Sequence, residues 1–175
     1  HKQTAPTNKP SSSRPGIYVL NQGGFTHSNS SLTYNDYPSN VLTADIFSAA
    51  NTSQLGDTGN DLGVYGSKMF IVVNNSDVVD VVNAKGAKLI KKITLYQPRS
   101  VVFYKGNALV TSYSGTVSII DTASLVITKT ITVGSSPEQM AVVNVKLYVA
   151  NSGGLDYPDV GTTVSMVDLT TYSET

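Results

Sequence analysis

The chain has 175 residues, of which 12 are lysine or arginine and 12 are aspartate or glutamate, so its net charge is zero. Charged residues make up only 14% of the chain, which argues against an extended electrostatic surface for nucleic acid or for an anionic membrane. Cysteine is absent, and this excludes disulfides, cysteine-ligated zinc and a thiol nucleophile.

The first residues differ in composition from the rest. Residues 1–15 are rich in proline, serine, threonine and asparagine and show no apolar periodicity. Such a composition is typical of a flexible segment. We therefore expect a flexible leader or lipoprotein tether over residues 1–15 and a folded region over residues 16–175.

From residue 16 onward, short alternating or β-branched runs are separated by glycine, asparagine, aspartate, serine or proline, which is the pattern of strands joined by turns. No window keeps a 3.6-residue period, so we expect essentially no helix. The expected strands are, in chain order, residues 16–21, 32–35, 41–47, 62–65, 68–74, 78–82, 88–95, 99–104, 109–113, 117–121, 126–133, 139–143, 147–151 and 164–168.

These runs repeat with a period of about 40 residues, the length of one β-propeller blade. Three markers share this period: the polar residue that ends one strand, the end of the strand before it, and a proline followed by a charged residue. The first marker is Asn83, Asp121 and Asp168, whose second interval is lengthened to 47 residues by an excess between Gly153 and Thr163. The other two are Asn74, Ser112 and Asn151, and Pro98–Arg99 and Pro137–Glu138.

The repeat also predicts how many blades the chain holds. With the strands of a blade labelled A to D from the axis outward, the chain reads B, C, D, then A to D twice, then A, B, C. An open stack of this kind would expose unpaired edges and apolar blade faces. We therefore expect an all-β fold, a β-propeller of four-stranded antiparallel blades in which this chain is about half of a seven-bladed ring. The remaining half of the propeller would be its partner.

Several segments resemble known propeller repeats. Residues 147–151 (LYVAN), 164–170 (VSMVDLT) and 131–138 (ITVGSSPE) resemble three segments of the YVTN β-propeller repeat. Residues 16–23 (GIYVLNQG), 55–57 (LGD) and 70–76 (FIVVNNS) resemble the YncE-like surface lipoproteins of gut Bacteroidetes.

This resemblance implies an extracytoplasmic location, as an outer-membrane surface lipoprotein. One type within the group, BtuG, captures cobalamin at the cell surface beside the TonB-dependent outer-membrane transporter BtuB. The resemblance therefore implies a vitamin B12-type corrinoid as the ligand and a transporter of the BtuB type as a partner.

Catalytic patterns are weak. The two histidines are His1 in the leader and His27 in a loop, which we interpret as a solvated loop residue, and no zinc, nucleophile-elbow or phosphate-loop motif occurs. Asp57, Asn60 and Asp61 could offer oxygen ligands to calcium, but their spacing favours turn capping. We expect a protein that is not an enzyme, with no metal and no cofactor apart from the suspected cobalamin ligand.

Tyrosine supplies 10 of the 14 aromatic residues, and its flat ring with one hydroxyl suits a ligand with apolar faces and amide edges. We expect ligand contacts on a rim formed by loops after the B strands and by the long loop 153–162. The predicted contacts on this rim are Phe25, Asn74, Tyr113, Asn151 and Tyr157, and the asparagines could instead bond turn backbone.

Arg99 and Glu138 are further candidates for ligand binding. They follow proline at equivalent points, and they could bond each other across blades or bind a polar ligand. We expect them at the opposite mouth of the propeller, as the alternative working face.

Two other functions remain open. One is a surface-layer or protein-interaction scaffold without a small-molecule ligand. The other is a nucleic-acid-binding YncE-like propeller, which the neutral charge disfavours, so we expect no nucleic acid among the partners. A propeller lyase is the least favoured, because no metal or nucleophile set is apparent.

Overall fold

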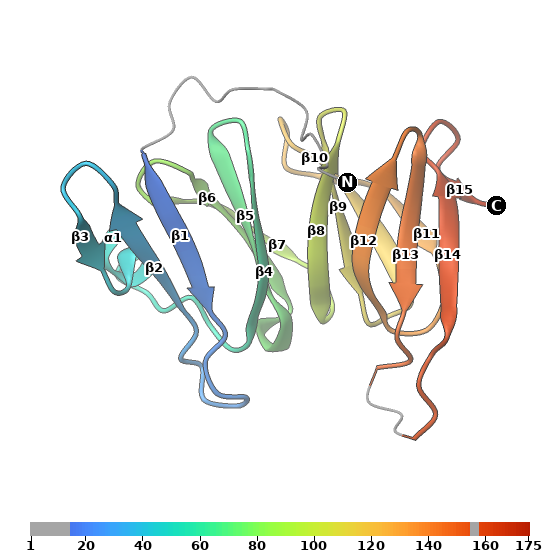
Figure 1. Cartoon of the computed structure of the whole chain (residues 1–175), viewed down its shortest axis with the longest axis horizontal. Helices are drawn as coiled ribbons and strands as arrows, with labels where there is room; N and C mark the ends of the chain where they lie inside the picture. The colour runs from blue at the N-terminus through green and yellow to red at the C-terminus, as the bar shows by residue number, and fades with distance from the viewer. Residues whose placement is uncertain (1–14, 155–157) are drawn as a thin grey trace.

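The computed structural model describes residues 15–154 and 158–175, so the expected leader lies, apart from Pro15, outside the described residues. Four antiparallel sheets stand side by side, as Figure 1 shows. The first holds β1 (Gly16–Asn21), β2 (Ser31–Asp36) and β3 (Val41–Thr43), and the second holds β4 (Gly59–Tyr65), β5 (Lys68–Val73), β6 (Val78–Asn83) and β7 (Leu89–Thr94). The third holds β8 (Pro98–Tyr104), β9 (Asn107–Ser112), β10 (Thr116–Asp121) and β11 (Ile127–Thr132), and the fourth holds β12 (Pro137–Val143), β13 (Lys146–Asn151), β14 (Thr163–Asp168) and β15 (Ser173–Glu174).

Within every sheet the strands follow one another in chain order, as in a propeller blade. The first strands of neighbouring four-stranded sheets pack against each other, β4 against β8 and β8 against β12. These three strands are therefore the inner strands, and the predicted all-β propeller of antiparallel blades is confirmed.

The first sheet has no inner strand among the described residues. The hairpin that follows β1 lies against the start of β4. The amide of Ser30 donates to the carbonyl of Gly56 (2.9 Å), and the amide of Gly59 donates to the carbonyl of Gln22 (3.2 Å). The end of β5 meets the start of β4 in the same way, through the amide of Asn74 and the carbonyl of Thr58 (2.8 Å). The ends of β1 and β5 therefore lie at the same end of the inner strand β4, so the two strands run in the same direction. In the first blade β1 is consequently the B strand, as β5 is in the second blade.

The polar residue that repeats at the end of the C strand closes the turn toward the D strand. The Oδ1 atom of Asn83 accepts from the amide of Lys85 (2.9 Å). Asp121 accepts from the amide of Ser124 (2.7 Å), and Asp168 from that of Thr170 (2.7 Å). A side-chain oxygen that bonds a backbone amide two or three residues ahead forms an Asx turn, and this explains the periodic marker.

Three expectations about secondary structure were wrong. The strand expected over residues 41–47 ends at Thr43, and helix α1 (Ile46–Asn51) follows it. The Oδ1 atom of Asp45 accepts from the amide of Ser48 and caps this helix, whose Ile46 and Phe47 are buried. A single turn of 3₁₀ helix, η1 (Asn74–Ser76), follows β5, and the fourth blade has the short outer strand β15, which the sequence was expected to lack.

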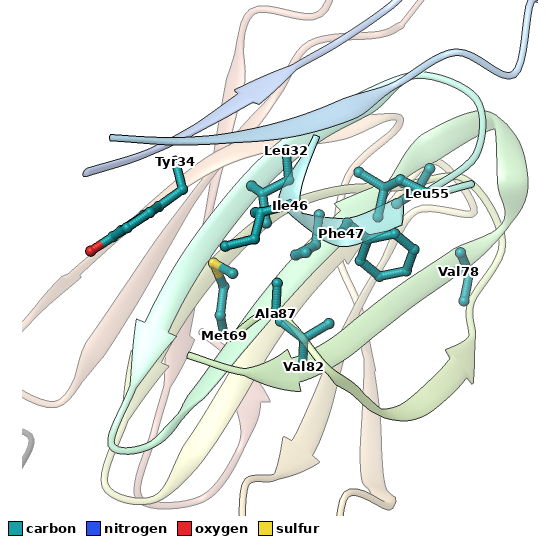
Figure 2. Close-up of a cluster of buried hydrophobic side chains, with 11 residues drawn as sticks. Leu32, Tyr34, Ile46, Phe47, Leu55, Met69, Val78, Val82 and Ala87 are labelled. Atoms are coloured by element: carbon teal, nitrogen blue, oxygen red, sulfur yellow. The ribbon is translucent and has the colours of Figure 1, made fainter. Parts of the chain in front are cut away.

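The core is divided into clusters between neighbouring blades. Figure 2 shows the cluster between the first two blades, where Phe47 of α1 and Leu32 and Tyr34 of β2 pack with Met69 of β5. Similar clusters join the second blade to the third and the third to the fourth. Lysines add links between blades: the Nζ atom of Lys91 donates to the carbonyl of Leu125 (2.7 Å), and that of Lys129 to the carbonyl of Thr171 (3.1 Å).

Candidate functional site

Each inner strand begins with the same irregularity. The strand register shifts between Gly59 and Asp61, between Pro98 and Val101, and between Pro137 and Met140. The residue just before each strand has a left-handed backbone, at Thr58 (φ 61°), Gln97 (φ 34°) and Ser136 (φ 46°). A β-bulge changes the direction of the side chains within it, and bulges and unusual backbone angles concentrate near functional sites. The residues inside the three bulges are therefore candidates for a site.

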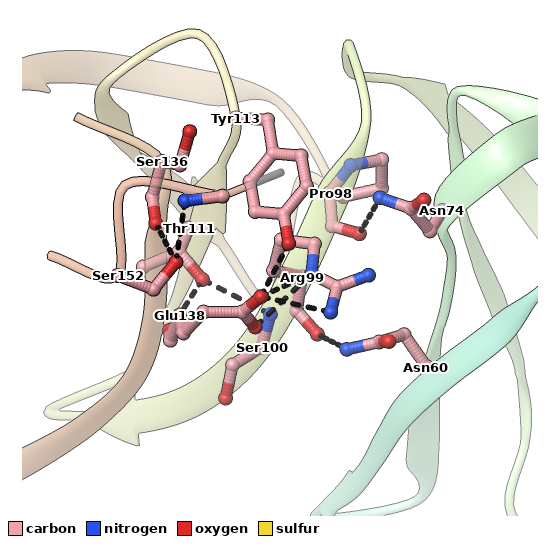
Figure 3. A network of polar contacts seen from close by, with 11 residues as sticks. Asn60, Asn74, Pro98, Arg99, Ser100, Thr111, Tyr113, Ser136, Glu138 and Ser152 are labelled. Carbon is pink, nitrogen blue, oxygen red and sulfur yellow. Dashed lines mark hydrogen bonds and ion pairs between the residues drawn. The ribbon is translucent and has the colours of Figure 1, made fainter. Parts of the chain in front are cut away.

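Two of these bulge residues form an ion pair across neighbouring blades (Figure 3). The Nη2 atom of Arg99 lies 2.8 Å from Oε1 of Glu138, and its Nε lies 3.0 Å from both carboxylate oxygens. Both side chains are mostly buried, with exposed fractions of 18% and 15%. Such charge-assisted contacts, made by two nitrogens of one guanidinium, are strong and fix the geometry of both groups.

Tyr113 completes this group. Its hydroxyl donates to Oε1 of Glu138 (2.5 Å), and the guanidinium carbon of Arg99 lies 4.7 Å from the centre of its ring. Partial burial raises the pKa of Tyr113 to about 12, and the hydrogen bond to the Glu138 carboxylate acts in the same direction. The phenol therefore stays protonated at neutral pH and acts as a donor. We call Arg99, Tyr113 and Glu138 the mouth triad.

Neighbouring side chains hold the backbone around the triad. Asn60 and Asn74 of the second blade donate through Nδ2 to the carbonyls of Arg99 (2.5 Å) and Pro98 (3.2 Å). The hydroxyl of Thr111 donates to the carbonyl of Glu138 (2.9 Å) and accepts from the amide of Ser100 (3.0 Å). The triad therefore stands on backbone that is fixed from adjacent blades.

The expectation that Arg99 and Glu138 lie at the opposite mouth from Tyr113 was wrong. The start of each inner strand pairs with the end of the following strand, Pro98 with Ser112 and Pro137 with Asn151. The residues that follow the B strands and those that open the A strands consequently share one mouth. The structure brings Arg99, Glu138 and Tyr113 together there.

The sequence markers grouped Asn151 with Asn74 and Ser112, and the place of Asn74 in this series was wrong. Gly59, Pro98 and Pro137 pair with Val73, Ser112 and Asn151, so these last three are equivalent. Asn151 is the last residue of β13 and only 5% exposed, and its Nδ2 donates to the hydroxyls of Thr163 (3.1 Å) and Ser165 (3.0 Å). The residue that follows Asn74 and Tyr113 in the repeat is Ser152, which bonds the carbonyl of Ser136 (2.8 Å).

The remaining predicted contacts are spread out. Phe25 is 67% exposed in the hairpin between β1 and β2, and its carbonyl lies 2.8 Å from Nδ1 of His27. Asn74 is buried and bonds Pro98, as described above. Tyr157 lies outside the described residues.

The residues considered for calcium bind protein groups instead. Asp57 accepts from the hydroxyl of Thr58 (2.8 Å) and the amide of Thr26 (3.2 Å). Asp61 accepts from the hydroxyl of Ser100 and the amide of Val101, both at 2.9 Å. In the described part of the chain, no group of three or more histidine, cysteine, aspartate or glutamate side chains is arranged to hold a metal ion.

Sequence reasoning missed Asn60 and Ser152 as members of this mouth. A signal for them exists in the 39-residue separation of Arg99 and Glu138. Counting one such period back from Arg99 reaches Asn60, and counting one period on from Tyr113 reaches Ser152. The period therefore identifies whole sets of equivalent mouth residues.

The sequence matches a family model over residues 15–170, which is most of the chain. The chain belongs to this family, which is described as Domain of unknown function (DUF5074). No curated protein matches the sequence.

Solved structures with the same fold include three proteins of diverse origin. Hydrazine synthase of Kuenenia stuttgartiensis aligns with a TM-score of 0.73 and 16% identity, over 91% of this chain and 44% of that one. BamB of Moraxella catarrhalis aligns with a TM-score of 0.66 and 15% identity, over 91% and 44%. Sqt1 of Saccharomyces cerevisiae aligns with a TM-score of 0.67 and 13% identity, over 93% and 48%. At these identities the likeness shows the propeller fold.

This chain spans less than half the length of each of the three structures. Among residues 15–154 and 158–175, no helix is long and apolar enough to cross a membrane.

Proposed function

We propose that this chain is part of a propeller that binds a ligand without catalysing a reaction, and that the ligand contacts the mouth triad. One observation carries the proposal: Arg99, Tyr113 and Glu138, from two neighbouring blades, converge at one mouth of the inner strands. Polar groups held on rigid strand ends form a preorganised surface, which lowers the cost of ordering on binding.

The chemistry of the triad suits a neutral ligand with both flat and polar parts. The Tyr113 ring offers apolar area, and the Arg99–Glu138 pair offers a cation and a carboxylate within one contact. The Tyr113 hydroxyl already donates its proton to Glu138, so toward a ligand it can only accept. A free anion is disfavoured because Arg99 already faces the Glu138 carboxylate. An amide, which both donates and accepts, meets these groups without leaving either charge unpaired.

We propose a vitamin B12-type corrinoid as this ligand. The resemblance of residues 16–23, 55–57 and 70–76 to YncE-like surface lipoproteins, a group in which BtuG is one type, supports this choice, as does the abundance of tyrosine. The proposal includes an outer-membrane surface location, delivery to a TonB-dependent transporter of the BtuB type, and the remaining half of a propeller that completes the mouth. Phe25, Asn74, Asn151 and Tyr157 are the further contacts proposed on this face.

Titration calorimetry with cobalamin tests the proposal. Replacing Tyr113 or Tyr157 by alanine should weaken binding at least tenfold, equivalent to about 1.4 kcal/mol, and about 2 kcal/mol if the tyrosine is a hot spot. Tyr37→Ala is the control, because Tyr37 is 61% exposed and lies in the turn between β2 and β3, at the other end of the blade.

Asn151→Ala tests the same face through a buried residue. If wild-type protein binds no cobalamin, the corrinoid is excluded. If cobalamin binds but none of the Tyr113, Tyr157 and Asn151 variants weakens binding while their melting stays normal, the site lies elsewhere.

A protein-interaction scaffold is the second candidate. It is favoured by the fact that the polar groups of the mouth triad bind one another. Arg99, Glu138 and Tyr113 already satisfy one another, as a clamp between two blades would require. In that case Tyr113→Ala should lower the melting temperature and leave small-molecule titrations without heat. The nucleic-acid alternative would require strongly salt-dependent binding, whereas the cation at this mouth is bonded to a carboxylate.

A further inference from the structure

Tyr96 is an exposed tyrosine beside the mouth triad that the contacts proposed so far do not include. It lies in the segment that joins β7 to β8, three residues before Arg99. Its carbonyl accepts from the hydroxyl of Ser112 (2.5 Å), and the carbonyl of Gln97 accepts from the amide of Tyr113 (3.2 Å). Tyr96 therefore emerges at the same mouth as the triad, next to the turn that carries Tyr113.

The backbone around Tyr96 is held from both neighbouring blades. On the side of the second blade, the amide of Leu95 donates to the carbonyl of Asp77 (3.0 Å), and the amide of Gln97 donates to Oδ1 of Asp77 (2.8 Å). On the side of the third blade it is held by the two bonds described above. A side chain carried by backbone that is already fixed costs less ordering entropy when a ligand binds to it.

This backbone arrangement does not require an aromatic side chain. Counting one period of 39 residues back and on from Tyr96 reaches Asp57 and Ser135. The carbonyls of these two residues also accept from the segment that follows the B strand, from the amides of Asn75 (3.2 Å) and Gly153 (3.3 Å). The fold therefore accommodates aspartate or serine at this position, so the ring of Tyr96 needs another explanation.

The ring and the hydroxyl of Tyr96 are both unengaged. Tyr96 is 56% exposed, and its side chain makes no hydrogen bond or ring contact within residues 15–154 and 158–175. In Tyr113, by contrast, the guanidinium of Arg99 lies over the ring and the hydroxyl donates to Glu138. Tyr96 can therefore offer a ligand both an aromatic face and a hydroxyl that donates as well as accepts.

We propose that Tyr96 is the principal aromatic contact for the ligand of this mouth, and that its hydroxyl donates to a carbonyl oxygen at the edge of that ligand. The inference rests on the proposed function, because it adds a residue to the same site. It also narrows the chemistry of the ligand, which must place an amide carbonyl beside a flat apolar surface. The Tyr96 ring supplies the exposed area that the mostly buried Arg99 and Glu138 do not.

Titration calorimetry with cyanocobalamin tests the ring and the hydroxyl separately. Tyr96→Phe removes the hydroxyl alone and should weaken binding about fivefold, through the loss of one hydrogen bond. Tyr96→Ala removes the ring as well and should weaken binding on the order of thirtyfold. Tyr37→Ala is the matched control, because Tyr37 is similarly exposed (61%) but lies at the other end of the first blade, and it should leave binding unchanged.

Equal binding by wild type and Tyr96→Ala overturns the proposal, and equal binding by wild type and Tyr96→Phe overturns the role of the hydroxyl. If Tyr113→Ala weakens binding and Tyr96→Ala does not, the mouth binds cobalamin without Tyr96, and the proposed function stands while this inference fails. If wild type binds no cobalamin, the corrinoid and the role of Tyr96 are overturned together.

NMR of ring-labelled tyrosine supplies a readout that a purely structural role would not move. Saturating cyanocobalamin should shift the ring signals of Tyr96 and leave those of Tyr37 in place. The melting temperature of Tyr96→Ala without ligand should equal that of wild type. Unshifted Tyr96 signals at saturation, or a lowered melting temperature that accounts for the weaker binding, would contradict direct contact.

Discussion

Arg99 and Glu138 occupy equivalent positions in neighbouring blades, 39 residues apart, and carry opposite charges that meet at 2.8 Å. In a radial repeat, equivalent positions are brought side by side around one axis. A repeat that placed the same charge at both positions would create repulsion at the mouth. The exchange of arginine for glutamate in successive blades instead joins the third blade to the fourth.

Removing the carboxylate from this pair should change the titration of Tyr113. In Glu138→Gln the phenol loses its charged acceptor while Arg99 remains over the ring, so the pKa of Tyr113 should fall from about 12 toward its ordinary value of 10. NMR of ring-labelled tyrosine measures this titration, and the other tyrosines are internal controls. An unchanged Tyr113 titration would contradict the hydrogen bond between its hydroxyl and Glu138. The variant should also lose about 1–3 kcal/mol of stability, because Arg99 is left without its partner.

Asp80 makes stability depend on pH in an unusual direction. Its side chain is fully buried on β6, with Lys92 3.1 Å away, and burial raises the pKa of Asp80 above its ordinary value despite this lysine. A carboxyl whose pKa is higher in the folded state contributes stability at low pH, and this contribution is lost as the pH rises through the raised pKa. We therefore expect wild type to lose stability relative to Asp80→Asn as the pH is raised above about 4.

Urea unfolding of both proteins between pH 4 and pH 7 measures this difference. Lys92→Met is the companion variant, since loss of the lysine should raise the pKa of Asp80 further and widen the pH range of the effect. A difference between wild type and Asp80→Asn that grows as the pH falls would contradict this account.

Gly63 of β4 sits where a side chain would collide with the next blade. A Cβ atom at this position would lie 2.6 Å from Cε2 of Phe103. We expect Gly63→Ala to cost about 1–3 kcal/mol, because overpacking forces a ring or a strand to move. Gly86→Ala is the matched control: a Cβ there meets nothing within 4 Å, and it should change stability by no more than about 1 kcal/mol. Chemical denaturation measures both, and equal effects would show that the blades separate easily.

The outer face of the fourth blade should make the isolated chain associate. Val143, Tyr148 and Val164 are 50%, 38% and 63% exposed there. Their equivalents include Leu109 and Val117, which are fully buried between the third and fourth blades. Exposed apolar patches of this kind mark interaction surfaces. Sedimentation velocity should show oligomers of residues 1–175, reduced by Val164→Lys, whereas a monodisperse 18.5 kDa monomer would contradict this expectation.

The fold could be predicted because the same turn chemistry recurs once in each blade, at spacings of 38 and 47 residues. Asn83, Asp121 and Asp168 each accept from a backbone amide two or three residues later in the chain. The repeat of polar residues in the sequence therefore marks the turn between the C and D strands of each blade. Helix α1 was not predictable in this way. It is six residues long, and its formation depends on the Asp45 cap and on burial of Phe47 against the neighbouring blade.

The site was predicted only in part, for a reason of register. Asn74, Ser112 and Asn151 look like one series, but η1 follows β5 directly, so Asn74 already lies one residue beyond the strand. A shift of one residue in a strand changes the face on which a side chain lies. This is why Asn151 is a buried strand residue while Tyr113 reaches Glu138. The convergence of Tyr113 with Arg99 depends on the bulge at the start of β8, which leaves no clear trace in composition.

The regular position of the three bulges has a consequence for how such a chain can lengthen or shorten. Gln97 and Ser136 both adopt the left-handed backbone immediately before a proline that opens an inner strand. Excising residues 98–136 would therefore join Gln97 to Pro137 with matching geometry on either side of the junction. Deletion or duplication of the coding sequence for residues 98–136 would then remove or add one blade. The strand register of every remaining hairpin would be unchanged.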